Sequence, residues 1–170
     1  MKIHAVRGDI TTLEVDAIVN AANTTLLGGG GVDGSIHYAA GPELLEECRS
    51  LGGCPTGEAR LTRGYRLKAK WIIHTVGPVW KDGRRGEPEL LASCYNSSLR
   101  LASDNQMRSI AFPAISTGAY AYPLKLATRI AILSVKAFAE QVGMPEEVIF
   151  SCYSREDYAV YKRFLRDLQV

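Results

Sequence analysis

Short runs of strand-forming residues alternate with helical patterns along the whole chain of 170 residues. Six runs have strand character: Lys2–Arg7, Asp16–Val19, Glu58–Thr62, Trp71–Val76, Ser109–Phe112 and Val148–Cys152. Four helices are expected among them: Gly34 to Arg49, Glu87 to Ser103, Leu124 to Val142, and a last one from Ser154. This alternation predicts a three-layer α/β/α sandwich, in which helices cover both faces of a mixed, largely parallel sheet.

Three of the expected helices carry local signals. Gly41-Pro42 lies inside the first helix and should kink or split it. The helix from Leu124 to Val142 is apolar nearly all round, apart from one narrow charged face, so we expect it to be largely buried against the sheet. Ser154 followed three residues later by Asp157 is the pattern of a capped helix start.

Composition limits the size of the fold and its partners. The chain is 46% apolar, which is enough for one full core, and we expect a single domain over residues 1–170. Its net charge is only +2, so electrostatic capture of nucleic acid is not expected. The polar, Gly-rich stretch Lys81–Gly86 is expected to be a surface loop.

The same survey gives a prediction of the compartment. The N-terminus has no apolar stretch of signal-peptide length, and no run is long enough to span a membrane. Four cysteines stand at spacings that match no zinc motif: Cys48, Cys54, Cys94 and Cys152. We therefore expect reduced thiols in a cytoplasmic protein, with no metal site.

Glycines gather between the second strand and the first helix, at Gly28–Gly31. Backbone amides without side chains at a helix N-terminus form a pocket for an anion such as phosphate. A flexible hinge is the alternative interpretation, because glycine runs also occur in linkers. Gly29, Gly31 and Gly34 satisfy GxGxxG. However, the four residues Thr24–Leu27 stand between the strand exit Asn20–Asn23 and the glycines, and no strand-end acid follows, so a dinucleotide fold is not expected.

Two further strand exits carry polar residues. The strand Ser109–Phe112 leads into Ser116-Thr117-Gly118, which alone would be an ordinary turn. Together with the first loop, it predicts a ligand with two phosphates held from both sides. Asp9 follows the first strand and either accepts a hydrogen bond from an exocyclic amine such as that of adenine or simply begins a turn.

Several motifs, taken in order along essentially the whole chain, resemble the signature of macrodomains. These segments are Gly8–Thr11, Val19–Asn23, Gly28–Gly34, Ile36-His37, Ala39–Pro42, Cys54–Ala59, His74–Pro78, Phe112–Gly118, Tyr120 and Tyr122-Pro123. The resemblance is greatest to the MacroD-type O-acetyl-ADP-ribose deacetylases of bacteria. It implies a domain that binds ADP-ribose.

The resemblance also implies where the ligand binds. Asp9 would hold the adenine amine with Ile10 alongside, and Tyr153 would stack on adenine, with Tyr158 or a purely structural Tyr153 as alternatives. The amides of Gly30, Gly31 and Val32 would face the diphosphate and the distal ribose. The opposite side would be closed by Ser116, Thr117, Gly118, Ala119 and Tyr120.

The implied reaction is hydrolysis, with no cofactor. Asn23 would bind the distal ribose, and Asp33 would act on, or orient, the attacking water; a GxSxG serine nucleophile is absent. The expected activity is deacetylation of O-acetyl-ADP-ribose, removal of mono-ADP-ribose from acidic side chains of proteins, or both. A reader that binds ADP-ribose without hydrolysing it is the alternative. The three histidines, His4, His37 and His74, are expected to be packing residues.

Overall fold

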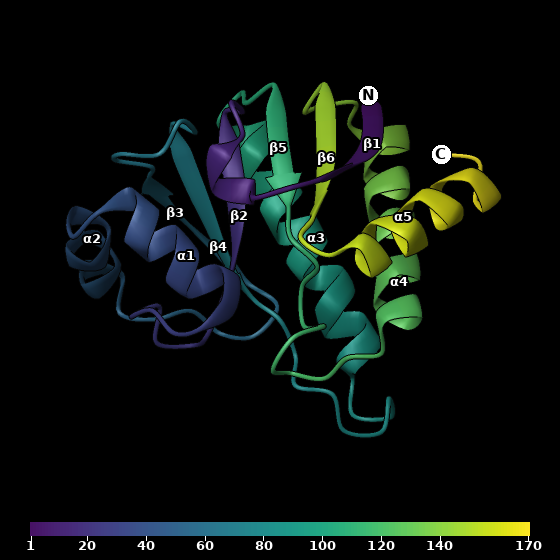
Figure 1. Cartoon of the computed structure of the whole chain (residues 1–170), viewed down its shortest axis with the longest axis horizontal. Helices are drawn as coiled ribbons and strands as arrows, with labels where there is room; N and C mark the ends of the chain where they lie inside the picture. Colours follow the sequence, from purple (N-terminus) through teal and green to yellow (C-terminus); the bar gives the residue numbers. More distant parts are fainter.

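One six-stranded sheet forms the centre of the protein, in a computed structural model that describes all 170 residues (Figure 1). Its strands are β1 (Lys2–Arg7), β2 (Ala17–Ala22), β3 (Ala59–Arg63), β4 (Trp71–Val76), β5 (Ser109–Phe112) and β6 (Glu147–Cys152). They lie in the order β1-β6-β5-β2-β4-β3. Only β3 is antiparallel to its neighbour, β4, so the predicted mixed, largely parallel sheet is confirmed.

Helices cover both faces of this sheet, as predicted (Figure 1). They are α1 (Gly31–Ala40), α2 (Glu43–Leu51), α3 (Glu87–Asp104), α4 (Leu124–Gln141) and α5 (Arg155–Asp167), with a short 3-10 helix, η1, at Ile10–Thr12. Apolar side chains of α1 and α2 pack in one buried cluster with β2 and β4. Those of α3, α4 and α5 pack in a second cluster on the other face.

The first helical pattern breaks where the sequence indicates. Gly41 takes a positive φ of 91°, and the pattern divides into α1 and α2 around Gly41-Pro42. The Ser154 cap is also confirmed, because its hydroxyl accepts a hydrogen bond from the Asp157 N–H at 3.0 Å.

Two expectations about the first loop are wrong in their boundaries. β2 continues three residues past Val19, because Asn20, Ala21 and Ala22 still pair with β4. α1 begins at Gly31 rather than Gly34, so the last glycine of the segment already belongs to the helix, whereas Gly28 and Gly29 lie in the loop and Gly30 is the N-cap.

The Leu124–Val142 helix was expected to be largely buried against the sheet, but α4 is buried along one side only. Leu126 of α4 is 50% exposed and Leu133 is 38% exposed. The inward stripe of α4 includes Ala127, Ala131 and Val135, which are buried against the rest of the second cluster. In a three-layer fold an outer helix keeps a solvent side, and here apolar residues occupy part of that side.

The parallel strands determine where the polar loops meet. β1, β2, β5 and β6 run in the same direction, so the segments that follow them emerge at one edge of the sheet. These segments contain Asp9, Asn23, Ser116 and Tyr153. The carboxyl edge of a parallel sheet is where α/β folds bind ligands.

Candidate ligand-binding and active site

A cleft at the carboxyl edge of the sheet consists of two adjoining cavities. One has a volume of about 440 Å³ and lies between the α1 N-terminus and the loop after β5. The other, of about 480 Å³, lies beside η1. Both are lined by Gly31, Val32, Ser151 and Tyr153, so they form one continuous depression.

The structure brings every expected site residue to this cleft. Asp9 and Ile10 line the cavity beside η1, and Tyr153 lines both cavities. The remaining ones line the cavity between the α1 N-terminus and the loop after β5: Asn23, Gly30, Gly31, Val32, Asp33, Ser116, Thr117, Gly118, Ala119 and Tyr120. Residues from opposite ends of the chain are therefore neighbours in the cleft.

The first wall of the cleft is the N-terminal turn of α1. Its first helical hydrogen bond runs from the Gly34 N–H to the Gly30 carbonyl, at 3.3 Å, so the preceding N–H groups have no helical acceptor. Unpaired amides at the positive end of a helix favour an anion. Gly34 is required here, because a Cβ would lie 2.6 Å from the Gly29 carbonyl oxygen.

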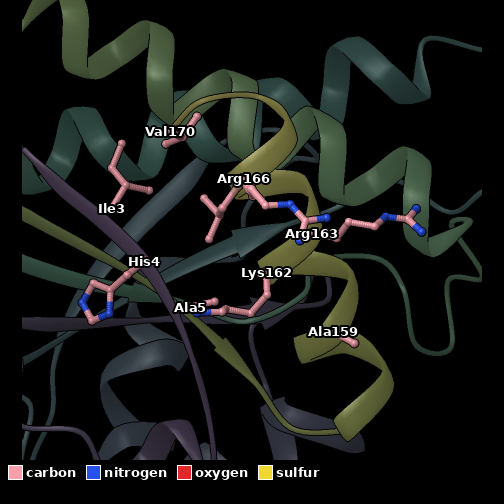
Figure 2. A pocket seen from close by; sticks show the side chains of 9 residues that line it. Ile3, His4, Ala5, Ala159, Lys162, Arg163, Arg166 and Val170 are labelled. Atoms are coloured by element: carbon pink, nitrogen blue, oxygen red, sulfur yellow. The ribbon is translucent and has the colours of Figure 1, made fainter.

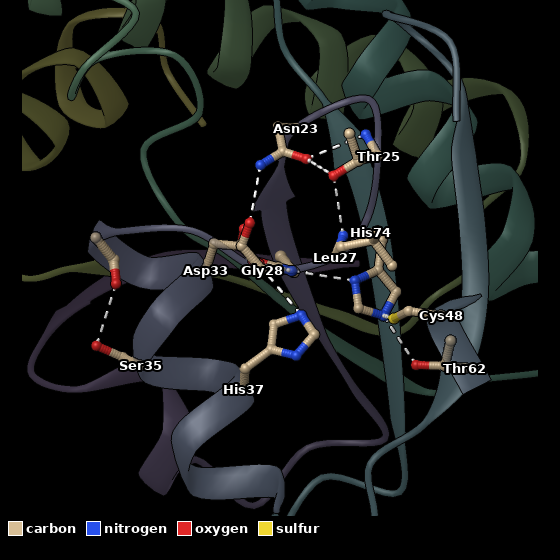
Figure 3. A network of polar contacts seen from close by, with 12 residues as sticks. Asn23, Thr25, Leu27, Gly28, Asp33, Ser35, His37, Cys48, Thr62 and His74 are labelled. Carbon is tan, nitrogen blue, oxygen red and sulfur yellow. Dashed lines mark hydrogen bonds and ion pairs between the residues drawn. The ribbon is translucent and has the colours of Figure 1, made fainter. Parts of the chain in front are cut away.

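Asp33, in the first turn of α1, has one oxygen held and one directed to the cleft (Figure 3). The Asn20 side-chain amide donates to Asp33 Oδ1 at 2.9 Å. The other oxygen, Oδ2, lies on the Gly29 side, 3.2 Å from where a Cβ of Gly29 would stand, and Asn23 Nδ2 is 3.4 Å from the same point. Asp33 Oδ2 and the Asn23 amide therefore both lie close to Gly29.

Behind Asn20, buried polar groups continue across the sheet into β4 and β3. Asn20 Nδ2 also donates to His74 Nδ1 at 3.0 Å, and the side chains of Asn20 and His74 are fully buried. Burial, with His37 nearby, lowers the pKa of His74 to about 3, so its ring is neutral. Because Nδ1 accepts, Nε2 carries the proton and donates to the Thr62 hydroxyl at 2.8 Å.

The other two histidines differ from His74. His37 Nε2 lies 3.5 Å from Asp33 Oδ1 and has no hydrogen-bond partner, although it is buried. His4 is on the edge strand β1, where its ring is partly exposed and contacts Glu147 at 2.8 Å. The expected packing role fits His74. It does not fit His4, which lies at the edge of the sheet, where no further strand pairs with β1.

Asn23 is already fixed by its own loop. Its Oδ1 accepts from the Thr25 N–H at 3.1 Å and from the Thr25 hydroxyl at 2.5 Å. One of its two amide hydrogens goes to the Gly28 carbonyl, at 2.9 Å. The second amide hydrogen is left to donate to a group in the cleft.

The second wall, residues 116–120, is shaped by its backbone. The Tyr122 N–H donates to the Ser116 carbonyl and the Ala121 N–H to the Gly118 carbonyl, both at 2.9 Å. Ser116 takes a positive φ of 69°, and its buried hydroxyl has no partner. The Ser116 hydroxyl also lies against Gly77, where a Cβ would overlap it.

A neighbouring loop braces the second wall. The Trp80 N–H donates to the Tyr120 carbonyl at 2.8 Å, and the Trp80 ring lies 4.6 Å from the Tyr122 ring. The segment after Trp80 wraps around the buried carboxylate of Glu87, which accepts four backbone N–H groups at 2.6–3.1 Å. Burial opposes ionisation, but these hydrogen bonds outweigh it and lower the pKa of Glu87 to about 2.

The far end of the cleft is built from η1 and Tyr153. Asp9 caps η1, where its Oδ1 accepts from the Thr11 N–H at 2.9 Å and the Thr11 hydroxyl at 2.7 Å. The turn-forming role that the sequence allowed for Asp9 is thus present, and the residue also lines the cavity. Tyr153 is 85% exposed at the rim, whereas Tyr158 packs against the core and lines neither cavity.

Sequence reasoning gave no role of their own to Asn20 and Gly77, and it assigned Gly29 only as one of the glycines of the Gly28–Gly31 anion pocket. Asn20 stood at a presumed strand end, and the only available signal was a polar residue in an otherwise apolar strand. Gly77 matters through its close contact with Ser116, which is distant in the chain, whereas the contacts of Gly29 with Asn23 and Asp33 are local but form only in the folded loop. Each of the three touches a residue that was predicted, namely Asp33 or Ser116.

Other chemistries find little support in the side chains. No cluster of three or more His, Cys, Asp or Glu side chains has metal-binding geometry. All four cysteines are free and buried, and burial raises the pKa of the Cys48 thiol to about 11, so it is not a thiolate nucleophile at neutral pH. None of the helices combines the length and the apolar character that crossing a bilayer requires.

These features define an α/β protein whose cleft is lined by the N-terminal turn of a helix and by a carboxylate, that of Asp33. Comparison with known proteins identifies its family. The Macro domain model matches residues 19–131. A Macro domain-containing protein of Chlorobaculum tepidum, CT2219, is 62% identical over 164 residues, covering 96% of this chain and 95% of the relative. The chain belongs to the Macro domain family.

Some relatives carry names that specify an activity. A protein of Escherichia fergusonii named O-acetyl-ADP-ribose deacetylase is 53% identical, covering 96% of this chain and 95% of that protein. A Xenopus laevis protein named ADP-ribose glycohydrolase MACROD2 is 55% identical, with 98% of this chain and 40% of the longer relative covered. A solved structure of an Oceanobacillus iheyensis macrodomain mutant with ADPR is 43% identical, with a TM-score of 0.93 and coverage of 98% and 92%.

Proposed function

We propose that this protein hydrolyses esters of ADP-ribose. Its substrates would be O-acetyl-ADP-ribose, mono-ADP-ribose attached to acidic side chains of proteins, or both. The observation that supports this proposal most directly is the position of the Asp33 carboxylate. Its Oδ1 accepts a hydrogen bond from Asn20, and its Oδ2 faces the cleft beside Asn23. The E. fergusonii relative is named O-acetyl-ADP-ribose deacetylase and the X. laevis relative ADP-ribose glycohydrolase, and both names support hydrolysis of an ADP-ribose derivative.

The proposed pose follows the length of the cleft. Adenine would lie beside Asp9 and Ile10, with the exposed ring of Tyr153 available for stacking. The diphosphate would lie between the amides of the α1 N-terminus and the 116–120 loop. The distal ribose would then reach Asn23 and Asp33.

The proposed step is attack by a water held at Asp33 Oδ2. The water oxygen forms a bond to the ester carbonyl carbon while Asp33 orients the water or accepts its proton. The bond between that carbon and the ribose oxygen breaks, the ribose oxygen gains a proton, and acetate leaves. For a protein ester, the same addition of water leaves free ADP-ribose and the protein carboxylate. Both reactions balance with water as the only co-substrate, so neither needs a cofactor.

The decisive experiment measures release of acetate from O-acetyl-ADP-ribose, and of ADP-ribose from a mono-ADP-ribosylated protein, together with calorimetry of ADP-ribose binding. We expect turnover by the native chain, a large loss in Asp33→Asn and in Asn23→Ala, and no change in Asp104→Asn, an exposed acid at the end of α3. Binding without any turnover would instead make the protein a reader of ADP-ribose.

The proposal has two corollaries. ADP-ribose, its O-acyl esters and mono-ADP-ribosylated proteins are the partners, and nucleic acid is not, in keeping with the net charge of +2. We place the protein in the cytoplasm, which the four unpaired, buried thiols support.

A further inference from the structure

A separate groove runs along the outer edge of the sheet, between β1 and α5 (Figure 2). Its volume is about 600 Å³, and it is lined by Ile3, His4 and Ala5 of β1, by one side of α5, and by Val170. It shares no lining residue with either cavity of the cleft. A ligand in this groove would therefore not compete with a ligand in the cleft.

The β1 side of the groove is an unpaired strand edge. β1 is the first strand of the sheet and pairs only with β6. The Lys2 N–H donates to the carbonyl of Glu146, just before β6, at 2.7 Å, and the Gly8 N–H donates to the carbonyl of Cys152, the last residue of β6, at 2.9 Å. Because such bonds recur at every second residue of a parallel pair, the N–H and C=O groups of Ile3 and Ala5 face the other way, into the groove.

The α5 side of the groove is basic. Ala159, Lys162, Arg163 and Arg166 are spaced three or four residues apart or adjacent, so they share one side of the helix. Lys162 and Arg163 form no ion pair, and only Arg166 has an acidic neighbour, Asp167 at 3.3 Å. Lys162 extends from α5 toward Ala5 (Figure 2).

Few acidic side chains lie near β1, and the one on β6 already has basic partners. Glu147, on β6, is bound to His4 at 2.8 Å and to Lys2 at 3.9 Å. The apolar residues Ile3 and Val170 face one another at the end of the groove (Figure 2). The groove thus offers main-chain donors and acceptors on one side, positive charge on the other, and apolar surface between them.

We infer that this groove binds an extended acidic segment of another protein, which adds to the sheet as a strand beside β1. Main-chain hydrogen bonds to the outward groups of Ile3 and Ala5 provide the register. Acidic side chains of the added strand then meet Lys162 and Arg166, which provides the charge selectivity. Single-stranded nucleic acid fits less well, because no Phe, Tyr or Trp lines the groove for base stacking.

The test uses the whole chain and a defined probe, the capped peptide Glu-Thr-Glu-Val-Glu-Thr-Glu carrying a fluorophore. We expect saturable binding at low salt that weakens as ionic strength rises, with amide NMR shifts concentrated at residues 3–7 and in α5. A peptide with Gln in place of every Glu, and one N-methylated at alternate residues, should both bind at least about tenfold more weakly, a change of about 1.4 kcal/mol.

Two variants separate the contributions of the two sides. Ala5→Pro removes an outward N–H without removing a β1–β6 hydrogen bond, so it should abolish peptide binding while the fold persists. Lys162→Glu should weaken peptide binding at least about tenfold, again about 1.4 kcal/mol. Arg129→Glu is the matched control, a charge reversal on the exposed side of α4, and should have no effect. ADP-ribose binding, measured in parallel, should be the same in all three variants.

Three results would overturn the inference: no peptide binding by the native chain, equal binding of the N-methylated peptide, or shifts outside the β1–α5 groove. In the first case the basic residues only keep the free edge from pairing with other chains. Binding of a ten-nucleotide single-stranded DNA in place of the peptide would also overturn it, and would assign the groove to a different class of partner.

Discussion

The two walls of the cleft are held in place by different means. Asp33, on the first wall, is fixed by buried side chains, in a line from Asn20 through His74 to Thr62. The second wall is fixed by main-chain bonds, by the close approach of Gly77, and by a neighbouring loop wrapped around Glu87. The first wall is therefore suited to hold a reacting group at one angle, and the second to enclose a ligand.

This difference predicts a separation of effects. Changes behind the first wall should act on kcat more than on affinity, because the anion-binding amides of α1 do not depend on Asn20. Changes behind the second wall should act on affinity for ADP-ribose and leave the Asp33 geometry as it is. The predictions below, on the assumption that the protein turns over O-acetyl-ADP-ribose, test whether the two walls are in fact independent.

The largest effect is expected from Asn20→Leu. It removes the hydrogen bond to the Asp33 carboxylate with little change in volume, and a bond to a charged group contributes about 1.5–3 kcal/mol. We expect kcat to fall roughly 10- to 150-fold, with ADP-ribose affinity changed less than about threefold. Ser98→Ala, at another fully buried polar residue, is the control. An equal loss of affinity and kcat in Asn20→Leu would mean that the walls are coupled.

Gly77→Ala should have the opposite signature. A Cβ at Gly77 would overlap the Ser116 hydroxyl and lie 2.7 Å from Ile115 Cγ2, and overpacking of this kind costs about 1–3 kcal/mol. Calorimetry should show ADP-ribose binding weakened roughly 5- to 150-fold, with kcat at saturation nearly kept. Gly118→Ala is the control for adding a methyl group to this loop, because a Cβ at Gly118 would meet no atom within 4 Å. The melting temperature of Gly118→Ala should be unchanged.

The same contrast explains how much of the site could be predicted from sequence. The exit Ser116-Thr117-Gly118 was predicted from strand and glycine patterns that are local in the chain, whereas Asp33, Ala119 and Tyr120 were predicted only through the resemblance to macrodomains. The groups that hold them were not found, since Asn20 bonds to His74 across 54 positions and Gly77 meets Ser116 only in the folded chain. The layers could be predicted from periodic patterns, whereas the strand order and these contacts depend on how the strands pair in the folded chain.

The buried polar residues behind the first wall, from Asn20 to Thr62, should also affect how the free energy of unfolding changes in acid. The pKa of His74 is lowered to about 3 in the fold and is about 6.5 in an unfolded chain, so between these values only the unfolded chain takes up the proton. His74 therefore contributes a loss of stability as pH falls from 6.5 toward 3. In urea titrations at pH 7, 6, 5 and 4, His74→Gln should lose less stability than the native chain over this range. Parallel curves would contradict the assignment.

The smallest effect is expected from Glu87→Gln. This variant tests whether the loop around Glu87, which supports the second wall, affects the affinity for ADP-ribose. The substituted amide presents an NH₂ group to backbone N–H donors, so several of the four bonds to the 81–85 segment should be lost. Trp80 then holds the Tyr120 carbonyl less firmly. We expect ADP-ribose to bind roughly two- to tenfold more weakly, the range for one modest hydrogen bond, with kcat kept.

Glu89→Gln, at an exposed position in the same turn of α3, is the control for Glu87→Gln and should leave binding unchanged. The pKa of Glu87, lowered to about 2, adds a pH signature to the same variant. A carboxyl with a lowered pKa contributes stability that is complete above about 4.5 and is lost as pH falls toward 2. Glu87→Gln should lack this component in acid titrations of stability. If Glu87→Gln lacks this acid-dependent stability and still binds ADP-ribose as the native chain does, Glu87 stabilises only the 81–85 loop, and the second wall does not depend on it.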